Sequence, residues 1–230
     1  MLAIVATIAL FTLAPQLDIA TSEFFERPNT NPEWRRHWSC GAFAFGCHPI
    51  LSPLREALHA LPLILAGLLL VATLWLAWRR RSFIETQVLQ MAAGFWAFVF
   101  GGMFLVDAVS KTLFARPRPY HLQIDIERFD DHRFIAPGQW GGACESNCSF
   151  PSGEAFALGW VVCATVLLPA RYRQAAFAVA LPLAIFGSLL RVVFGAHFLS
   201  DVIVGALLAV LTFSLCQIAA AAIDRRAKLR

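Results

Sequence analysis

The polar residues best suited to chemistry lie in one short segment between two apolar runs, Arg191–Asp201, which reads RVVFGAHFLSD. His197 and Asp201 are four residues apart, so on a helix they would share one face and could meet. A carboxylate partner fixes the tautomer of a histidine and makes its ring more basic, which suits a nucleophile or a general base. Arg191 adds a planar guanidinium that matches a phosphate group. The alternative is a hydrogen-bonded polar cluster near a helix end, with no chemical role.

Two other segments carry groups that bind anions. Lys111 stands at the end of an apolar run, and Arg116 and Arg118 follow closely. Farther along the chain, Ser152 and Gly153 lead directly into another apolar run. The first turn of a helix presents free backbone N–H groups and the positive end of the helix dipole, and both favour an anion.

The elements that must position these residues are long apolar segments. Of the 230 residues, 58% are hydrophobic and only 15% are charged. This composition is too apolar for a soluble domain of this length, so it predicts an all-α membrane helix bundle, formed as one domain over residues 1–230. Six apolar runs are predicted membrane spans; most approach the roughly 20 residues that a span requires, while the first and fourth are short and are expected to extend into flanking residues. The six runs are Leu2–Leu17, Leu58–Trp78, Val88–Val109, Ala155–Pro169, Ala175–Phe194 and Val202–Ile223.

Basic residues in short loops predict the orientation of this bundle. The first run could instead be a cleaved signal peptide, but no Lys or Arg precedes its apolar core, which favours an uncleaved span. With six spans, three basic segments fall on one side: residues 78–82, residues 170–174 and the tail after Ile223. Because Lys and Arg concentrate on the cytoplasmic side, that side and both termini are predicted to be cytoplasmic.

The predicted topology brings all the chemical groups named above to the opposite, external face. Cations, a helix N-terminus and a carboxylate-supported histidine at one membrane edge describe a phosphoryl-transfer site. Ionisable groups at membrane depth are costly, so a functional use is the default interpretation. The net charge of +4 reflects the basic loops, and no basic arm indicates a nucleic acid as partner. No cluster of ligands indicates a metal or another cofactor.

Four cysteines lie in the two loops that this topology places outside the membrane, where disulfides persist. The simplest pairing is Cys40–Cys47 and Cys144–Cys148, although four cysteines allow three connectivities. Cys163 and Cys216 lie in apolar runs and are predicted to be packed thiols. The first of these loops, Asp18–Pro53, is rich in aromatic residues, which indicates either an amphipathic stretch along the outer membrane interface or simply an aromatic loop.

Three short motifs follow one another in the second half of the chain. They are Lys111 and Arg118-Pro119 with six residues between them; Pro151-Ser152-Gly153 followed by Glu154; and Arg191, His197 and Asp201 preceded by Leu190. In this order and spacing they resemble the three motifs of the type-2 phosphatidic acid phosphatase family of membrane lipid phosphatases. The family pattern has a histidine at position 154 and a serine at position 190. Each motif is weak alone, but three in order are specific.

The resemblance implies a mechanism in two steps. His197 would attack phosphorus with the assistance of Asp201, and water would then hydrolyse the phosphohistidine. The residues implied to hold the phosphate oxygens, where charge spreads in the transition state, are Lys111, Arg118, Arg191, Ser152 and Gly153. The family needs no metal ion.

Glu154 is the departure from the family pattern that matters most, because the family's histidine there gives a proton to the leaving oxygen. A buried site and a bound phosphate favour the protonated carboxyl that this role requires, whereas nearby cations oppose it. We predict that Glu154 is this acid. The alternatives are a histidine from the external loop (His121 or His132), a leaving group that needs no proton, or a Glu154–arginine pair in an inactive protein. Leu190 removes only one hydroxyl contact.

The predicted function is hydrolysis of a lipid phosphate at the periplasmic face of a bacterial inner membrane. The family resemblance implies a short list of substrates, and we place lipid A phosphate first because the external loops are elaborate and carry cysteines. Undecaprenyl diphosphate and phosphatidylglycerol phosphate come next. A phosphotransferase that passes phosphate between lipids and an inactive protein that binds lipid phosphates are the alternatives. Vanadate-dependent haloperoxidases share the motifs, but six spans argue against that soluble chemistry.

Overall fold

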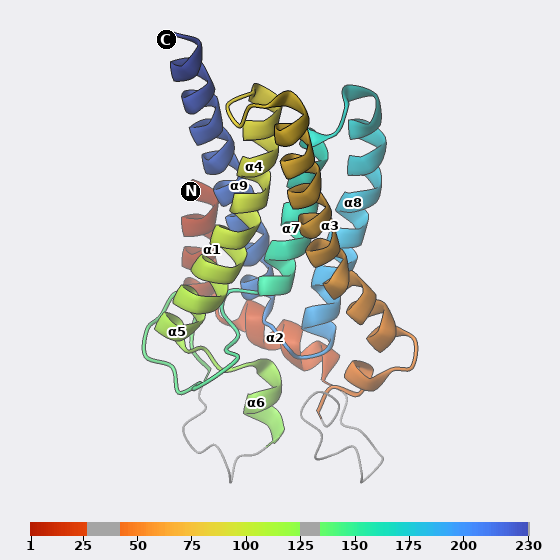
Figure 1. Cartoon of the computed structure of the whole chain (residues 1–230). Helices are drawn as coiled ribbons and strands as arrows, with labels where there is room; N and C mark the ends of the chain where they lie inside the picture. The colour runs from red at the N-terminus through yellow and green to blue at the C-terminus, as the bar shows by residue number, and fades with distance from the viewer. Residues whose placement is uncertain (27–41, 125–133, 230) are drawn as a thin grey trace.

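The computed structural model describes residues 1–26, 42–124 and 134–229 as a bundle of long helices (Figure 1). Every regular element within these ranges is helical, which confirms the all-α prediction. The elements are α1 (Leu2–Leu13), α2 (Gln16–Phe25), η1 (Ala44–Cys47), α3 (Leu51–Arg80), α4 (Thr86–Phe98), η2 (Val99–Ser110), α5 (Lys111–Phe114), α6 (Pro119–Ile124), α7 (Gly153–Ala164), η3 (Thr165–Leu167), α8 (Ala170–Val193) and α9 (Leu199–Lys228).

Four helices are long and apolar enough to cross a membrane. They are α3, the continuous helix Thr86–Phe114 formed by α4, η2 and α5, then α8 and α9. The bent pair α1 and α2 counts as a fifth if it forms one span. The run predicted as a span at Ala155–Pro169 is the shorter apolar helix Gly153–Leu167. Length and composition of the described residues therefore give four or five spans, where the sequence predicts six.

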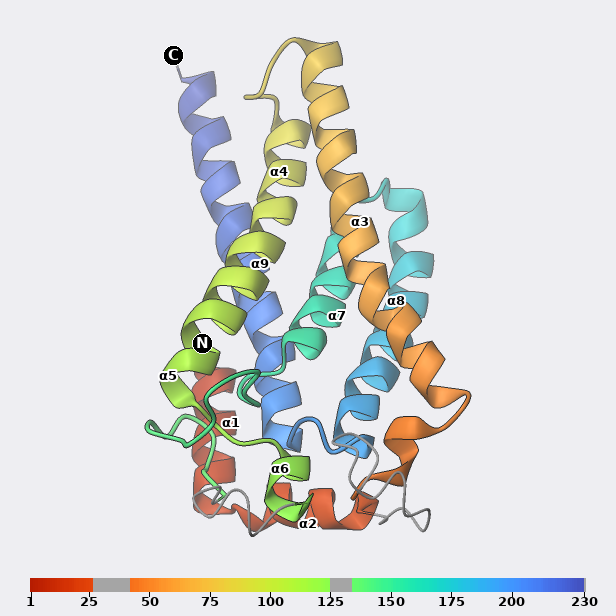
Figure 2. The ribbon, with the colours of Figure 1, turned by 60° about the horizontal axis from the view of Figure 1, so that its bottom comes forward.

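The first predicted span is shorter than expected, and the loop predicted to begin at Asp18 begins as a helix. The chain bends by 78° between α1 and α2, where Pro15 occupies the N-cap of α2. Proline lacks the N–H that would continue α1, and its fixed φ suits a helix start. Figure 2 shows α2 lying across the ends of α8 and α9. The N-terminus lies partway along the bundle, far from the level of the C-terminus (Figure 1).

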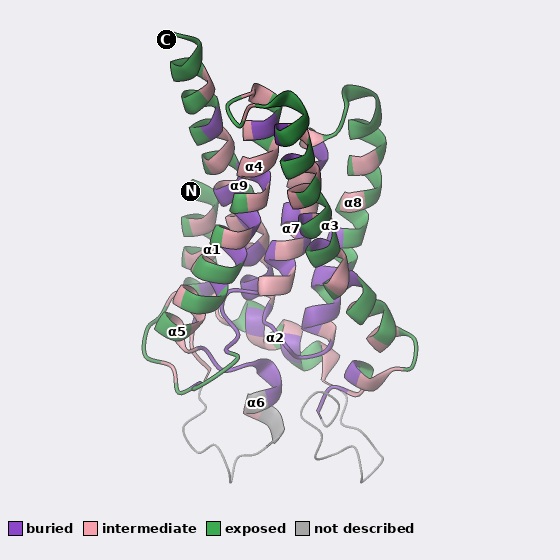
Figure 3. Ribbon diagram, viewed as in Figure 1, coloured by how far each residue is buried: buried purple, intermediate pink, exposed green. Residues whose placement is uncertain are grey.

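The short helix α7 forms the centre of the bundle. Its Phe156 and Trp160 are almost fully buried and pack against Phe98 and Val106 of the neighbouring helix. Trp160 donates its indole N–H to the carbonyl of Gly94 at 2.8 Å, which satisfies the polar atom of this buried ring. Figure 3 shows buried residues gathered along the middle of the bundle, with exposed residues on the outer faces of the long helices. Many of the exposed side chains are large and apolar, as a lipid environment favours.

The loop between α8 and α9 is held by close packing. Gly195 has φ of +63°, a backbone conformation that glycine adopts without strain. A Cβ at this position would lie 2.3 Å from the ring of Phe43, so a side chain would displace that ring. The Gly195 carbonyl also accepts a hydrogen bond from the Tyr120 N–H at 3.0 Å. Phe43 is therefore part of the packed interior, not of an interfacial aromatic surface.

The cysteine predictions are confirmed where the structure describes them. Cys144 and Cys148 form a disulfide, and Cys163 and Cys216 are free and half-buried. Cys40 lies outside the described residues, so its pairing with Cys47 stays a prediction.

Candidate active site

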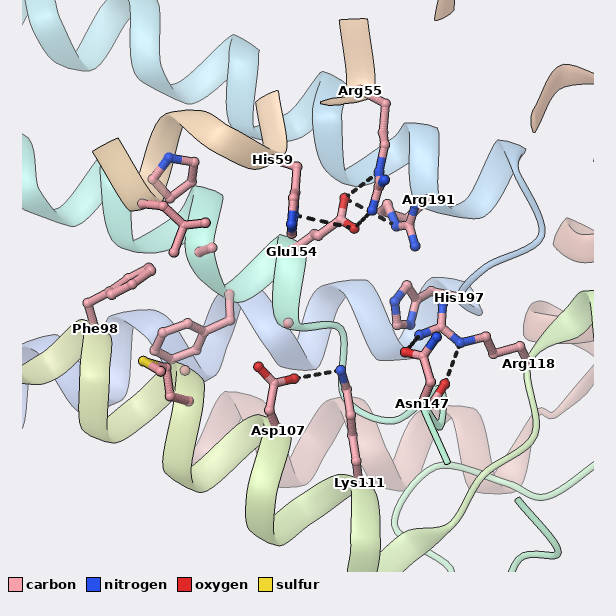
Figure 4. A pocket seen from close by; sticks show the side chains of 17 residues that line it. Arg55, His59, Phe98, Asp107, Lys111, Arg118, Asn147, Glu154, Arg191 and His197 are labelled. Atoms are coloured by element: carbon pink, nitrogen blue, oxygen red, sulfur yellow. Dashed lines mark hydrogen bonds and ion pairs between the residues drawn. The ribbon is translucent and has the colours of Figure 1, made fainter. Parts of the chain in front are cut away.

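A cavity of about 310 Å³ lies where α3, η2, α5 and the first turn of α7 meet the loop between α8 and α9 (Figure 4). Part of its wall is apolar, formed by Pro62, Leu63, Phe98, Met103 and Phe156. Its titratable lining residues are Arg55, His59, Asp107, Lys111, Arg118, Glu154, Arg191 and His197. Six of the eight predicted site residues line it, while Ser152 and Asp201 lie outside its wall.

His197 is 2% exposed, and its ring lies at the cavity wall. Nδ1 is 2.7 Å from the carbonyl oxygen of Ser149. A carbonyl only accepts hydrogen bonds, so Nδ1 carries the proton and Nε2 keeps its lone pair. This is the tautomer that a nucleophilic imidazole requires.

Asp201 does not hold the ring in the way that the four-residue spacing predicts. Oδ2 of Asp201 is 3.7 Å from Nδ1 of His197, an ion-pair distance, and the hydrogen bond of the ring goes to Ser149. The reason is local: α9 begins at Leu199, so His197 precedes the helix that carries Asp201. Asp201 instead accepts hydrogen bonds from the Phe198 N–H at 2.9 Å and from the Ser149 hydroxyl. It therefore fixes both segments that position the ring.

Burial lowers the pKa of His197 to about 3; Arg118 and Arg191 act in the same direction, and Asp201 opposes them. The folded protein therefore takes up a proton on this ring only in strong acid, whereas an exposed imidazole does so near pH 6.5. We expect the ¹⁵N resonances of the His197 ring to keep neutral-imidazole shifts from pH 8 to pH 5. The measurement is NMR on ¹⁵N-histidine-labelled protein, with His197→Asn for assignment. Titration of this ring near pH 6.5 would contradict the burial argument.

A fully buried ionic network lies behind the His197 loop. Arg116 makes ion pairs with Asp18, at 2.9 Å, and with Asp201. It also donates to the Ser200 hydroxyl at 2.9 Å, and its guanidinium lies 4.2 Å from the ring centre of Phe198. Asp18 in turn accepts the Ser200 N–H at 2.9 Å. Arg116, predicted to stand among the cations at the site, therefore joins α2 to the start of α9 and does not line the cavity.

The three predicted phosphate-binding cations come together at the cavity, each from a different segment (Figure 4). Lys111 is held by Asp107 at 2.5 Å. Arg118 donates to the carbonyl and the side-chain oxygen of Asn147 at 2.7 and 2.6 Å. Arg191 is 8% exposed, and its buried Nε makes no hydrogen bond to any described residue. This nitrogen is ion-paired with Glu154 Oε2 at 3.3 Å without forming a hydrogen bond, so its N–H can still be donated to an incoming phosphate oxygen.

Ser152 and Gly153 have different roles at the start of α7. Ser152 is the N-cap, and its Oγ accepts the Ala155 N–H at 3.3 Å. The Ser152 N–H is donated to the Asp201 carbonyl at 3.0 Å, so it is not available to a phosphate group. Gly153 does line the cavity. Of the two residues predicted to bind phosphate, only Gly153 is placed to do so.

Gly153 has no Cβ at the position where Lys111 and Asp107 approach the helix. A Cβ there would lie 3.0 Å from Asp107 Oδ1 and 3.6 Å from Lys111 Nζ. We therefore expect Gly153→Ala to shift this pair and lower kcat/KM on the order of 10- to 100-fold, since small misplacements are costly at a reacting centre. Gly67→Ala is the matched control, because nothing lies within 4 Å of its Cβ. Equal kcat/KM in both variants would mean that Lys111 tolerates displacement.

Glu154 is surrounded by basic side chains. Arg55 donates Nε to Glu154 Oε2 at 3.1 Å and makes a second bond from Nη2 to Oε1. Arg191 Nε lies 3.3 Å from Oε2, and His59 Nδ1 lies 3.7 Å from Oε1 (Figure 4). The two arginines stabilise the ionised carboxylate, which is the form that cannot donate a proton. The alternative histidines are not described here: His132 and the side chain of His121 lie outside the described residues.

Sequence reasoning missed three cavity residues, Arg55, His59 and Asn147. Arg55 and His59 are four residues apart, on one face at the start of α3. That spacing of two basic residues at the outer end of a predicted span was the one available signal. Asn147 adopts a positive φ of 52° in an irregular loop, and no pattern marks it. No group of three or more His, Cys, Asp or Glu suited to a metal ion occurs in the described part of the chain.

Known proteins similar to this chain agree with the motifs. A sequence profile of the PAP2 superfamily matches residues 96–223. A protein of Rhizobium leguminosarum named lipid A 4'-phosphatase is 34% identical over 217 residues, covering 91% of this chain and 89% of that protein. A protein of Rhizobium etli with the same name is 31% identical over 218 residues, covering 91% of this chain and 81% of that protein. No solved structure matches.

Proposed function

The chain belongs to the PAP2 superfamily, and on that premise we propose that it is a membrane phosphatase that removes a phosphate group from lipid A. The two relatives named lipid A 4'-phosphatase support the 4'-phosphate monoester as the bond that is hydrolysed. The observation that carries the proposal is the buried, neutral imidazole of His197 at a cavity that Lys111, Arg118 and Arg191 also line.

The proposed reaction proceeds through a phosphohistidine. Nε2 of His197 attacks phosphorus while the bond to the sugar oxygen breaks, and the Ser149 carbonyl holds the Nδ1 proton throughout. Lys111, Arg118 and Arg191 stabilise the charge that spreads over the phosphoryl oxygens in the transition state. Water then attacks the phosphohistidine and releases inorganic phosphate. Asp201 is a positioning residue, which acts through the loop that carries His197.

The proposed location is a bacterial inner membrane, with the site facing the periplasm. The basic residues at the end of α3, the start of α8 and the end of α9 lie at the end of the bundle opposite the site (Figure 1). That distribution supports a cytoplasmic location for those ends. The Cys144–Cys148 disulfide lies in the loop before α7, on the side of the site, and supports an oxidising compartment there. We further propose one domain over residues 1–230 with six membrane-embedded segments, of which α1 and α7 are short.

The test is phosphate release in detergent from lipid A, undecaprenyl diphosphate and phosphatidylglycerol phosphate. The proposal predicts release from lipid A, with the 4'-dephosphorylated lipid as the product identified by mass spectrometry. Release from another lipid only would overturn the proposal that lipid A is the substrate, but it would support the proposal that the protein is a phosphatase. Transfer of phosphate to a second lipid instead of water would identify a phosphotransferase. No release from any phosphate ester would overturn the proposed function.

A further inference from the structure

The proposed reaction needs a proton donor for the leaving oxygen. The alkoxide that departs from a sugar phosphate is a strong base, and a positioned acid typically accelerates such a step by about 10²- to 10⁴-fold. Glu154 is paired with Arg55 and Arg191, which hold it in the ionised form. Among the described residues, the donor must therefore be another titratable group that lines the cavity.

Most of the other titratable groups that line the cavity are unsuited to donate this proton. Asp107 and Lys111 are already engaged with each other in an ion pair at 2.5 Å. The lining arginines stay charged in proteins and do not exchange protons near neutral pH. His197 has its lone pair committed to phosphorus. Among the described side chains at the cavity, the group left is the imidazole of His59, a side chain type that both gives and takes protons near neutral pH.

The geometry of His59 suits this role. It projects from α3 one helical turn after Arg55, so both side chains face the Glu154 carboxylate (Figure 4). Nδ1 of His59 lies 3.7 Å from Glu154 Oε1. This distance is longer than a hydrogen bond, and catalytic contacts of this kind often shorten only when substrate binds. The side chain is 48% exposed, which lets water restore its proton between turnovers.

We propose that His59 is the acid and base of the reaction and that Glu154 is its positioning residue, an inference that rests on the proposed phosphatase function. In the first step, protonated His59 gives its Nε2 proton to the sugar oxygen as the P–O bond breaks and the P–N bond to His197 forms. In the second step, neutral His59 takes a proton from the attacking water as the new P–O bond forms and the P–N bond breaks. His59 thus ends each cycle protonated, and one water is consumed for one alcohol and one phosphate released.

A comparison of leaving groups tests this assignment. His59→Asn should lower turnover of alkyl phosphates, lipid A included, by about 10²- to 10⁴-fold. Turnover of an aryl phosphate should fall by less than about 10-fold, because a phenolate leaves without a proton. If His59 is the acid, alkyl ester turnover by the wild type should fall at high pH, and this fall should be absent in His59→Asn. The matched control is His48→Asn: His48 Nδ1 accepts the N–H groups of Ile50 and Leu51, and asparagine can do the same.

A double variant separates the roles of His59 and Glu154. If Glu154 acts through His59, adding Glu154→Gln to His59→Asn should lower alkyl phosphate turnover little further. If Glu154 donates the proton itself, Glu154→Gln should still lower turnover strongly in the His59→Asn background. Equal losses on alkyl and aryl esters, or no loss in His59→Asn, would overturn the inference and leave the phosphatase proposal standing. The leaving-group comparison uses any ester that the wild type hydrolyses, so a wrong lipid substrate does not prevent it. A wild type inactive on every ester would overturn both proposals.

Discussion

Replacement of His197 by asparagine is expected to lower phosphate release from lipid A by roughly 10⁴- to 10⁶-fold, the range for loss of a catalytic nucleophile. The ring nitrogen that attacks phosphorus is absent in asparagine. The side-chain amide can still donate to the Ser149 carbonyl, the bond that Nδ1 makes in the native protein. The loop between α8 and α9 should therefore keep its conformation while the chemistry is lost.

The measurement pairs steady-state phosphate release with thermal unfolding in the same detergent. His48→Asn serves as the control here as well, because His48 lies between η1 and α3 and does not line the cavity. Its activity should match that of the wild type. Substantial activity in His197→Asn, with an unchanged unfolding midpoint, would mean that another group attacks phosphorus.

Replacement of Arg116 by methionine is expected to cost about 3 to 5 kcal/mol in the free energy of unfolding, the usual penalty for breaking a buried ion pair from one side. Asp18 and Asp201 are both fully buried, and each is paired with this one guanidinium. Methionine preserves much of the apolar contact with Phe198 but leaves two carboxylates without their cation. Activity should fall as well, because Asp201 fixes the His197 loop.

Unfolding by denaturant in mixed micelles measures this cost, and Arg80→Met is the matched control. Arg80 is 56% exposed and lies 3.6 Å from Glu85, so removal of its charge should change stability by less than about 1 kcal/mol. Asp18→Asn should destabilise less than Arg116→Met, since Asp201 still neutralises the guanidinium. Similar unfolding midpoints for Arg116→Met and Arg80→Met would show that the buried network contributes little to stability.

The helices could be predicted from the sequence where an apolar run is long enough to cross a membrane. The apolar runs at α3, α4, α8 and α9 are long enough that only a helix satisfies their backbone in a membrane. The apolar run Leu2–Leu17 predicts one span, yet the chain bends between α1 and α2, and α2 turns across the bundle. The sequence around Asp18 does not predict that this side chain is buried, because its partners Arg116 and Ser200 lie far away in the sequence.

Only the site residues that belong to short sequence motifs could be predicted. Five residues, Lys111, Arg118, Gly153, Arg191 and His197, are predicted from the sequence itself and Glu154 from the family resemblance, and the structure brings all six to one cavity. Arg55 could not be linked to Glu154 from the sequence, because 99 residues separate them. The prediction that Asp201 meets His197 assumed a continuous helix, whereas the chain turns at Gly195 before α9 begins.

The central claim is that phosphate passes through His197, and rapid-quench labelling tests it most directly. Lipid A with a ³²P-labelled 4'-phosphate is mixed with the wild type and quenched in alkaline denaturant, which preserves phosphohistidine, and the labelled peptide is sequenced by mass spectrometry. We predict label on His197 during the first turnover and none in His197→Asn. Phosphate release with no label at any time, or label on a different residue, would contradict the account.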